Sequence, residues 1–228
     1  MSVRARGLAV VGGLLAAMSL GAVRAPAAGP PSVERFRVTE GRLKALGRGV
    51  QRIDVPRLRA VVDAGDTPWG CTWACLAPER PREAQLRFVY RGPTQTERPL
   101  RSGESRRQVG LKLRARDGCN VVYVMWRLAP TPGLVVSVKS NPVQHRSREC
   151  GNGGYDTVKP ARAAEVPVLE PGEEHTLRAR LEGKTLVVQV DGRTAWEGTL
   201  PDEALTFDGP TGLRTDNGQF DVELRATP

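Results

Sequence analysis

Basic side chains recur at alternate positions of several apolar stretches in the middle of the chain. At five positions in these stretches the basic residue lies on the strand face opposite to the apolar residues, and a tyrosine lies on one of the same faces. The six residues are Arg87, Lys112, Arg114, Arg127, Lys139 and Tyr123. Arginine and lysine donate strong hydrogen bonds to carboxylate and sulfate groups, and an aromatic ring suits the face of a sugar. If these stretches are neighbouring strands of one sheet, the six residues line one groove. We therefore predict a binding site for an anionic glycan there.

A simpler interpretation of the same pattern stays open. A strand with one buried face commonly presents charged residues to solvent on the other face. A basic groove also suits protein partners, so a structural or protein-interaction domain of the cell surface is a second alternative. Nucleic acid is not expected as a partner, because exposed aromatic residues are not interleaved with the basic positions. The sequence does not specify the oligomeric state.

Recognisable catalytic motifs are absent from the sequence. The two histidines, His145 and His175, have no metal-ligand spacing and do not assemble a Ser-His-Asp triad. Gly183-Lys184-Thr185 lacks the glycine that a phosphate-binding loop requires five residues earlier, so it indicates a hairpin turn. We predict no catalytic residue, no metal site and no cofactor. A sugar-active enzyme with an unfamiliar carboxylate pair is the alternative.

Four cysteines, Cys71, Cys75, Cys119 and Cys150, predict two disulfides in an exported chain. A zinc site is disfavoured, because its cysteine pairs are usually separated by two residues, whereas three residues separate the first pair here. Of the three possible pairings we favour Cys71 with Cys75 and Cys119 with Cys150. The first pair would close a local turn and the second would hold a long loop.

The N-terminus has the pattern of a secretory signal peptide. Arg4 and Arg6 precede an apolar run that ends in small residues near position 28. We expect residues 1–28 to be removed, residues 29–34 to form a short linker and residues 35–228 to form one domain without a membrane span. The formal net charge then falls from +9 to +6, because three arginines leave with the signal peptide. The expected location is secreted, periplasmic or in the cell envelope.

Short apolar stretches of period two run through the rest of the chain and are separated by Gly, Pro, Asn and Asp. They predict an all-β fold of two stacked antiparallel sheets. The expected strands are 35–39, 42–46, 50–53, 57–62, 84–90, 108–116, 121–128, 134–139, 175–181, 185–190, 194–199, 212–215 and 219–225. Two long segments, residues 63–81 and 140–171, lack this alternation and are expected to be loops that could carry a site. The first holds Trp69 and Trp73, whose indoles either pack on the nearby disulfide or offer a sugar platform.

Turn glycines and core positions in the last third of the chain carry a resemblance to a known fold. The residues are Pro171-Gly172, His175-Thr176-Leu177, Glu182-Gly183-Lys184, Asp191-Gly192, Trp196-Glu197-Gly198, Gly212-Leu213-Arg214 and Phe220. Residues 171–225 resemble the closing half of concanavalin A-like lectin/glucanase sandwiches, such as laminin G-like modules and a related bacterial sugar-hydrolase family. The resemblance implies an antiparallel jelly roll whose curved sheet commonly carries a carbohydrate site, without indicating which sugar.

The glucanases of that superfamily place three carboxylates at alternate positions of one strand. The nearest approach here is Gln219-Phe220-Asp221-Val222-Glu223, whose first member is an amide and cannot act as the nucleophile. We interpret Asp221 and Glu223 as a solvated strand face. Laminin G-like relatives sometimes hold calcium, but only Glu149 and Asp156 lie near the corresponding loop, so no metal is predicted. The expected function is an exported, non-catalytic, lectin-like module.

Overall fold

The computed structural model describes residues 35–63 and 82–227, which belong to one compact unit. The expected signal peptide and linker lie outside the described residues, as do Cys71, Cys75, Trp69 and Trp73. No helix among the described residues is long and apolar enough to cross a membrane.

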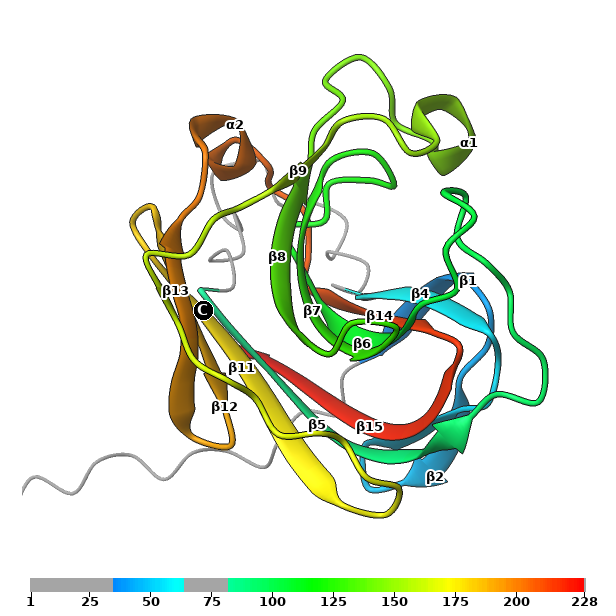
Figure 1. Ribbon diagram of the computed structural model, residues 1–228. Coiled ribbons are helices and arrows are strands. Elements are labelled where there is room, and N and C mark those ends of the chain that lie inside the picture. The colour runs from blue at the N-terminus through cyan, green and yellow to red at the C-terminus, as the bar shows by residue number, and fades with distance from the viewer. Residues whose placement is uncertain (1–34, 64–81, 228) are drawn as a thin grey trace, which may run out of the picture. The chain divides into compact units, whose positions relative to one another are not determined.

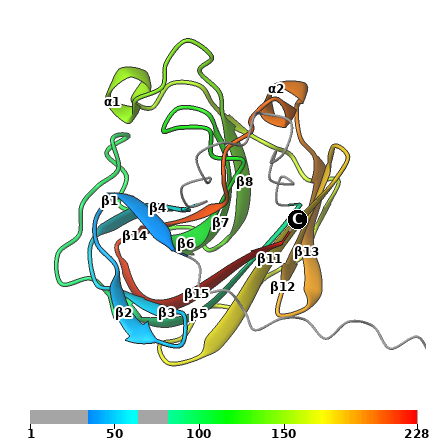
Figure 2. The same ribbon diagram turned by 180° about the vertical axis from the view of Figure 1, so that it is seen from behind.

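Two antiparallel sheets make up the fold (Figures 1 and 2). The seven-stranded sheet has the order β1 (Phe36–Glu40), β4 (Arg57–Val62), β14 (Gly212–Asp216), β6 (Arg107–Leu113), β7 (Val121–Ala129), β8 (Gly133–Lys139) and β9 (Tyr155–Thr157). The eight-stranded sheet has the order β10 (Arg162–Ala163), β13 (Arg193–Thr199), β12 (Thr185–Val190), β11 (Glu174–Glu182), β5 (Glu83–Pro93), β15 (Gly218–Thr227), β3 (Val50–Ile53) and β2 (Lys44–Gly47). Two single-turn helices, α1 (Ser147–Cys150) and α2 (Asp202–Leu205), lie in the connections. The predicted all-β, two-sheet fold is therefore confirmed.

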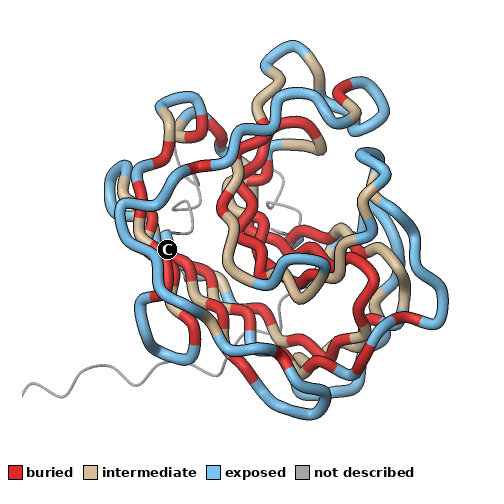
Figure 3. Tube along the Cα trace, in the orientation of Figure 1, coloured by how far each residue is buried: buried red, intermediate tan, exposed pale blue. Residues whose placement is uncertain are grey.

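The hydrophobic core lies between the sheets and is built by the period-two alternation of their strands. In β7, Val124 and Trp126 are buried in this core, and in β5 Phe88 is buried there as well. The Phe88 ring meets Trp126 edge to face at 5.6 Å and Phe220 of β15 at 6.0 Å, an arrangement that favours the contact beyond simple burial. Buried segments follow the facing strands, while the connecting loops are exposed (Figure 3).

All thirteen predicted strands are present, but the structure adds four elements that the sequence analysis missed. The two helices have only four residues each, which is too short for helical periodicity to be visible. β9 and β10 have three and two residues, all exposed, so they show no alternation of buried and exposed positions. Both are edge strands in the segment that was expected to be a loop.

Candidate functional site

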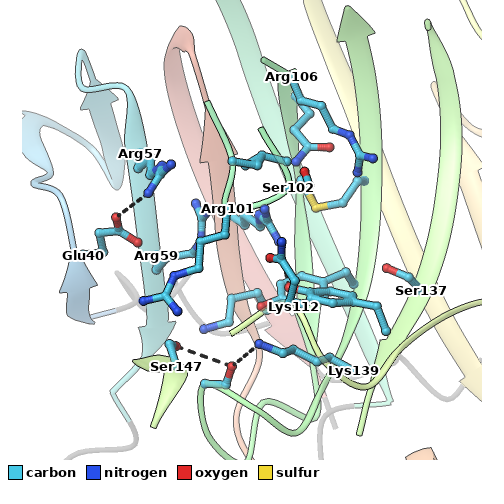
Figure 4. Close-up of a pocket in the computed structure, with 18 of the residues that line it drawn as sticks. Glu40, Arg57, Arg59, Arg101, Ser102, Arg106, Lys112, Ser137, Lys139 and Ser147 are labelled. Atoms are coloured by element: carbon cyan, nitrogen blue, oxygen red, sulfur yellow. Dashed lines mark hydrogen bonds and ion pairs between the residues drawn. The ribbon is translucent and has the colours of Figure 1, made fainter. Parts of the chain in front are cut away.

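A cavity of about 670 Å³ lies on the face of the seven-stranded sheet that points away from the core. Its floor is formed by side chains of β1, β4, β14, β6, β7, β8 and β9. One wall comes from residues 100–106 in the connection between β5 and β6, and the other from residues 147–152, which include α1. Figure 4 shows Arg101 and Ser102 of the first wall and Ser147 of the second beside the strand residues. Its volume is in the range of small-molecule sites.

Strand alternation determines which side chains reach the floor. In β7, Val124 and Trp126 face the core, so Tyr123, Met125 and Arg127 face the cavity. Lys112 of β6 is paired with Tyr123, whereas Gln108 of β6 is paired with Arg127. The cavity therefore extends along the strands, with Lys112 and Arg127 at different levels of the sheet.

The lining of the cavity is strongly basic. Of its described residues, nine are arginine or lysine and one, Glu40, is acidic. Glu40 itself lies 3.8 Å from the guanidinium of Arg57. This imbalance favours an anionic occupant, since most of the positive charges have no carboxylate within the cavity.

Lys112 is the most unusual of these cations. It is only 5% exposed, yet its ammonium has no hydrogen-bond or ion-pair partner among the described residues. Burial, together with the positive charges of Arg59, Arg214 and Arg37, lowers the pKa of Lys112 to about 8. A buried charge without a partner costs stability, and a lysine with a pKa shifted in this way in a cavity is a candidate for a binding residue.

Two of the floor arginines, by contrast, share a buried counter-charge. Asp216 is fully buried and accepts hydrogen bonds from Arg59 at 2.6 Å, Arg214 at 2.9 Å and Gln108 at 2.6 Å. Burial acts to raise the pKa of Asp216, but the two guanidiniums outweigh it and hold the pKa below its usual value. Asp216 therefore stays ionised and holds both arginines in place.

Two stacked tyrosines border the Lys112 end of the cavity. The rings of Tyr123 and Tyr155 lie 6.0 Å apart at an angle of 23°, and Arg214 lies 4.9 Å from the Tyr123 ring. Burial raises the pKa of Tyr123 to about 12, with a further contribution from Tyr155. Lys139 lies 5.0 Å from the Tyr155 ring and donates a hydrogen bond to the carbonyl oxygen of Gly151 at 2.9 Å. Tyr155 is 43% exposed, so this aromatic pair offers a surface to a sugar ring.

A disulfide holds the wall that contains α1. Cys119, two residues before the start of β7, is bonded to Cys150 at the end of α1, as predicted from the cysteine spacing. The wall formed by residues 100–106 is held differently, because Asn217 donates hydrogen bonds to the carbonyl oxygens of Arg98 at 3.1 Å and Arg106 at 2.9 Å. Both walls are thus attached to the sandwich at points next to the cavity floor.

The structure brings together four of the six residues predicted for the groove. Lys112, Tyr123, Arg127 and Lys139 all line the cavity. They come from three strands, β6, β7 and β8, that are neighbours in one sheet. Their role in binding stays a prediction.

The other two predicted residues lie elsewhere, which corrects the predicted groove. Arg87 belongs to β5 of the eight-stranded sheet, and its Nε donates to Glu223 at 3.1 Å on the face away from the core. Arg114 follows the end of β6 with a φ of 52°, which breaks the alternation. Its guanidinium donates to the carbonyl oxygens of Ala204 and Leu205 instead of entering the cavity.

Several basic lining residues were missed from the sequence: Arg57, Arg59, Arg101, Arg106, Arg148 and Arg214. A signal existed for Arg57 and Arg59, because they alternate with the core residues Leu58 and Ala60 in one strand. Arg101, Arg106 and Arg148 lie in the walls, where no periodic pattern distinguishes a lining residue from an exposed one.

The carboxylates of the last strand are remote from the cavity, since β15 belongs to the other sheet. The prediction of a solvated face was wrong for Asp221, which is only 7% exposed. Its two oxygens accept hydrogen bonds from Arg52 at 2.7 Å and Arg91 at 2.9 Å, and these guanidiniums cover it. Glu223 is likewise paired with Arg87 and Arg225. These partners lower the pKa of both carboxyl groups although burial opposes the shift.

Comparison with known proteins identifies the fold. No protein-family model and no curated protein matches the sequence. Among solved structures, the carbohydrate-binding module CBM66 from Bacillus subtilis is 12% identical, with a TM-score of 0.53, over 84% of this chain and 93% of that chain. A tetrameric galectin from the ball sponge Cinachyrella sp. is 14% identical, with a TM-score of 0.43, over 67% of this chain and 96% of that chain. The likeness to the first of these, together with the two antiparallel sheets, shows that the chain has a concanavalin A-like jelly-roll fold.

Proposed function

We propose that the protein is a non-catalytic carbohydrate-binding module that holds an anionic glycan in the cavity of the seven-stranded sheet. The observation that carries this proposal is Lys112, a buried ammonium that faces the cavity without a partner among the described residues. A carboxylate or sulfate of the ligand would supply the missing counter-charge. The exposed ring of Tyr155 supports a sugar as the body of that ligand.

Glycoside hydrolysis is the weaker candidate for this cavity. It requires two carboxyl groups about 5 to 10 Å apart in one cleft. Glu40 is the one carboxylate among the described lining residues, and Arg57 lies beside it. Asp216 lies under the floor, fully buried between two arginines, where it is held ionised and away from a substrate.

Export is part of the proposal. The signal-peptide pattern of residues 1–28 and the disulfide between Cys119 and Cys150 support a secreted, periplasmic or envelope location, where such disulfides persist. Glycans of cell surfaces and matrices are accessible there.

Polygalacturonate and its methyl ester test the proposal, because they share a backbone and differ in charge. We expect polygalacturonate to bind and the ester to bind much more weakly, with an affinity for the acid that falls as salt is raised. Arg101→Gln should weaken binding by about five- to tenfold, the value of one lost hydrogen bond. Arg162→Gln removes the same charge from exposed β10 of the other sheet and serves as the control.

Isothermal titration calorimetry measures the binding of both polymers to the wild type, to Arg101→Gln and to Arg162→Gln. Equal binding of acid and ester would contradict an anionic ligand. Equal losses in Arg101→Gln and Arg162→Gln would show that net charge alone attracts the polymer, and would overturn the cavity as the site.

The disulfide provides a second test of the cavity, because it holds the α1 wall. The double variant Cys119→Ser/Cys150→Ser should bind polygalacturonate about three- to tenfold more weakly, since the wall must then be ordered when the ligand binds. Titration at a temperature well below the unfolding midpoint separates this effect from loss of fold. An unchanged affinity in the folded double variant would exclude the α1 wall from the site.

A further inference from the structure

Cations with unpaired donors lie at both ends of the cavity. At one end is the Lys112 ammonium, which has no partner among the described residues. At the other end are Arg127 and Arg106, each with a buried Nε that makes no hydrogen bond to a described residue. Figure 4 shows Lys112 and Lys139 near one end of the cavity and Arg106 at the opposite end.

The Lys112 end of the cavity has a positive potential that would attract one negative group. Arg59 and Arg214 add positive potential at Lys112, but both donate hydrogen bonds to Asp216. Arg59 also donates to the carbonyl oxygens of Leu58 and Thr215, and Arg214 also donates to the hydroxyl of Tyr155. Lys139 lies on the same side and its ammonium is held by the carbonyl oxygens of Gly151 and Gly118. Among these strand cations, Lys112 is therefore the one without a hydrogen bond to a described residue.

The second end has a different chemistry, because its cations are guanidiniums. Arg127 makes no hydrogen bond or ion pair with any described residue, although its side chain is partly buried. Burial and the neighbouring Arg106 lower the pKa of Arg127. Arg106 is paired with Glu104 through one terminal nitrogen, which leaves its buried Nε unsatisfied. A planar carboxylate or sulfate in the cavity would accept hydrogen bonds from the terminal nitrogens of Arg127, which make none with a described residue.

The two ends are separated along the strands of the sheet. Lys112 is paired with Tyr123, and Arg127 follows Tyr123 by four positions on β7. Four residues of antiparallel strand correspond to about 13 Å. Between them lie Met125 and Arg214, and Arg214 donates a hydrogen bond to Asp216. This backbone separation supports two separate contact points for a ligand.

We propose that the cavity contains two anion subsites, so that its ligand is an oligosaccharide carrying two negative groups more than one sugar unit apart. This inference rests on the proposed function, because it assumes that a glycan occupies the cavity. A ligand that reaches both subsites gains the second contact as an intramolecular step, which raises affinity well beyond that of either subsite alone.

Oligogalacturonates of increasing length, from one unit to six, test this inference by calorimetry. The single acid should bind weakly to Lys112, and affinity should rise by about a hundredfold at the length that first spans both subsites, after which it should level off. In Arg127→Met this rise should be lost while the affinity for the single acid is retained. Arg106→Gln is a second variant at the Arg127 end of the cavity. Arg162→Gln, which removes the same charge elsewhere, is again the control.

The outcomes separate the two proposals. If no oligomer of any length binds, the proposed function fails. If the oligomers bind with an affinity that does not step up with length, and neither Arg127→Met nor Arg106→Gln alters it, the second subsite is excluded while an anionic ligand at Lys112 stands. Thermal unfolding of each variant shows whether it is folded before titration.

Discussion

Replacing Lys112 by methionine is expected to stabilise the protein by about 3 kcal/mol at pH 7 and to weaken its binding of an anionic glycan by about 10- to 100-fold. The stability gain follows from the pKa of about 8, compared with 10.5 for a free lysine, because ionised Lys112 is held in the fold at a cost. Methionine is similarly long and unbranched, so it fills the same space without the charge. The binding loss follows because the charge is the group that the ligand would pair with.

The pH dependence of this effect has a definite sign. Below pH 8 Lys112 is charged in both the folded and the unfolded chain, and the full cost is present. Between about pH 8 and 10.5 the folded protein loses this proton first, so wild-type stability rises relative to the variant. Urea unfolding of both proteins at a series of pH values should show the gap closing over this interval. Ligand affinity of the wild type should fall over the same interval, since the proton must be regained on binding.

Lys139→Met is the matched control. Burial also lowers the pKa of Lys139, but its ammonium donates hydrogen bonds to two backbone carbonyls, so its removal should stabilise the protein less than the removal of Lys112. A Lys112→Met variant less stable than the wild type at pH 7, or a gap constant from pH 7 to 10.5, would show that Lys112 has an internal partner and would remove the main support for an anion site.

The sequence predicted the faces of the strands better than it predicted their neighbours. Alternation in β6, β7 and β8 correctly separated core residues from Lys112, Tyr123, Arg127 and Lys139. Arg87 has an equally regular alternation, but β5 pairs with β11 and β15, strands that lie far along the chain. Period two specifies the face of a strand and carries no information about the sheet to which it belongs.

Asp216 shows a second limit of sequence reasoning. The predicted strand stopped at residue 215, because Asp216-Asn217-Gly218 has the composition of a hairpin turn. Asn217 does adopt a positive φ of 54°, but β14 and β15 belong to different sheets, so the chain crosses the sandwich here. The side chains of this crossing then become internal: Asn217 holds one cavity wall and Asp216 holds two arginines. The pairing of a carboxylate with a given arginine depends on this crossing and on strand pairing, which the sequence pattern does not specify.

Replacing Asp216 by asparagine is expected to destabilise the protein by about 3 to 5 kcal/mol, the usual cost of removing one partner from a buried ion pair. Asparagine retains the shape and an oxygen acceptor, but it leaves Arg59 and Arg214 without a counter-charge under the cavity. Asp202→Asn is the control, because that carboxylate is 79% exposed and its ion pair with Lys184 should contribute at most about 1 kcal/mol. A loss for Asp216→Asn no larger than for Asp202→Asn would contradict a stabilising ion-pair network at Asp216.

Two further measurements, one at low pH and one with a second substitution, show whether the loss of stability is due to the charge of Asp216. The pKa of Asp216 is lowered in the folded protein, so its contribution is present at neutral pH and is lost as pH falls below the ordinary value of 3.8. The difference between wild type and Asp216→Asn should therefore shrink in acid. With Asp216 removed, Lys112 faces two uncompensated arginines, so Lys112→Met should stabilise the Asp216→Asn protein by more than it stabilises the wild type. Equal gains in the two backgrounds would show that Lys112 and the Asp216 network act independently, and that Asp216 does not shape the electric field at the Lys112 ammonium.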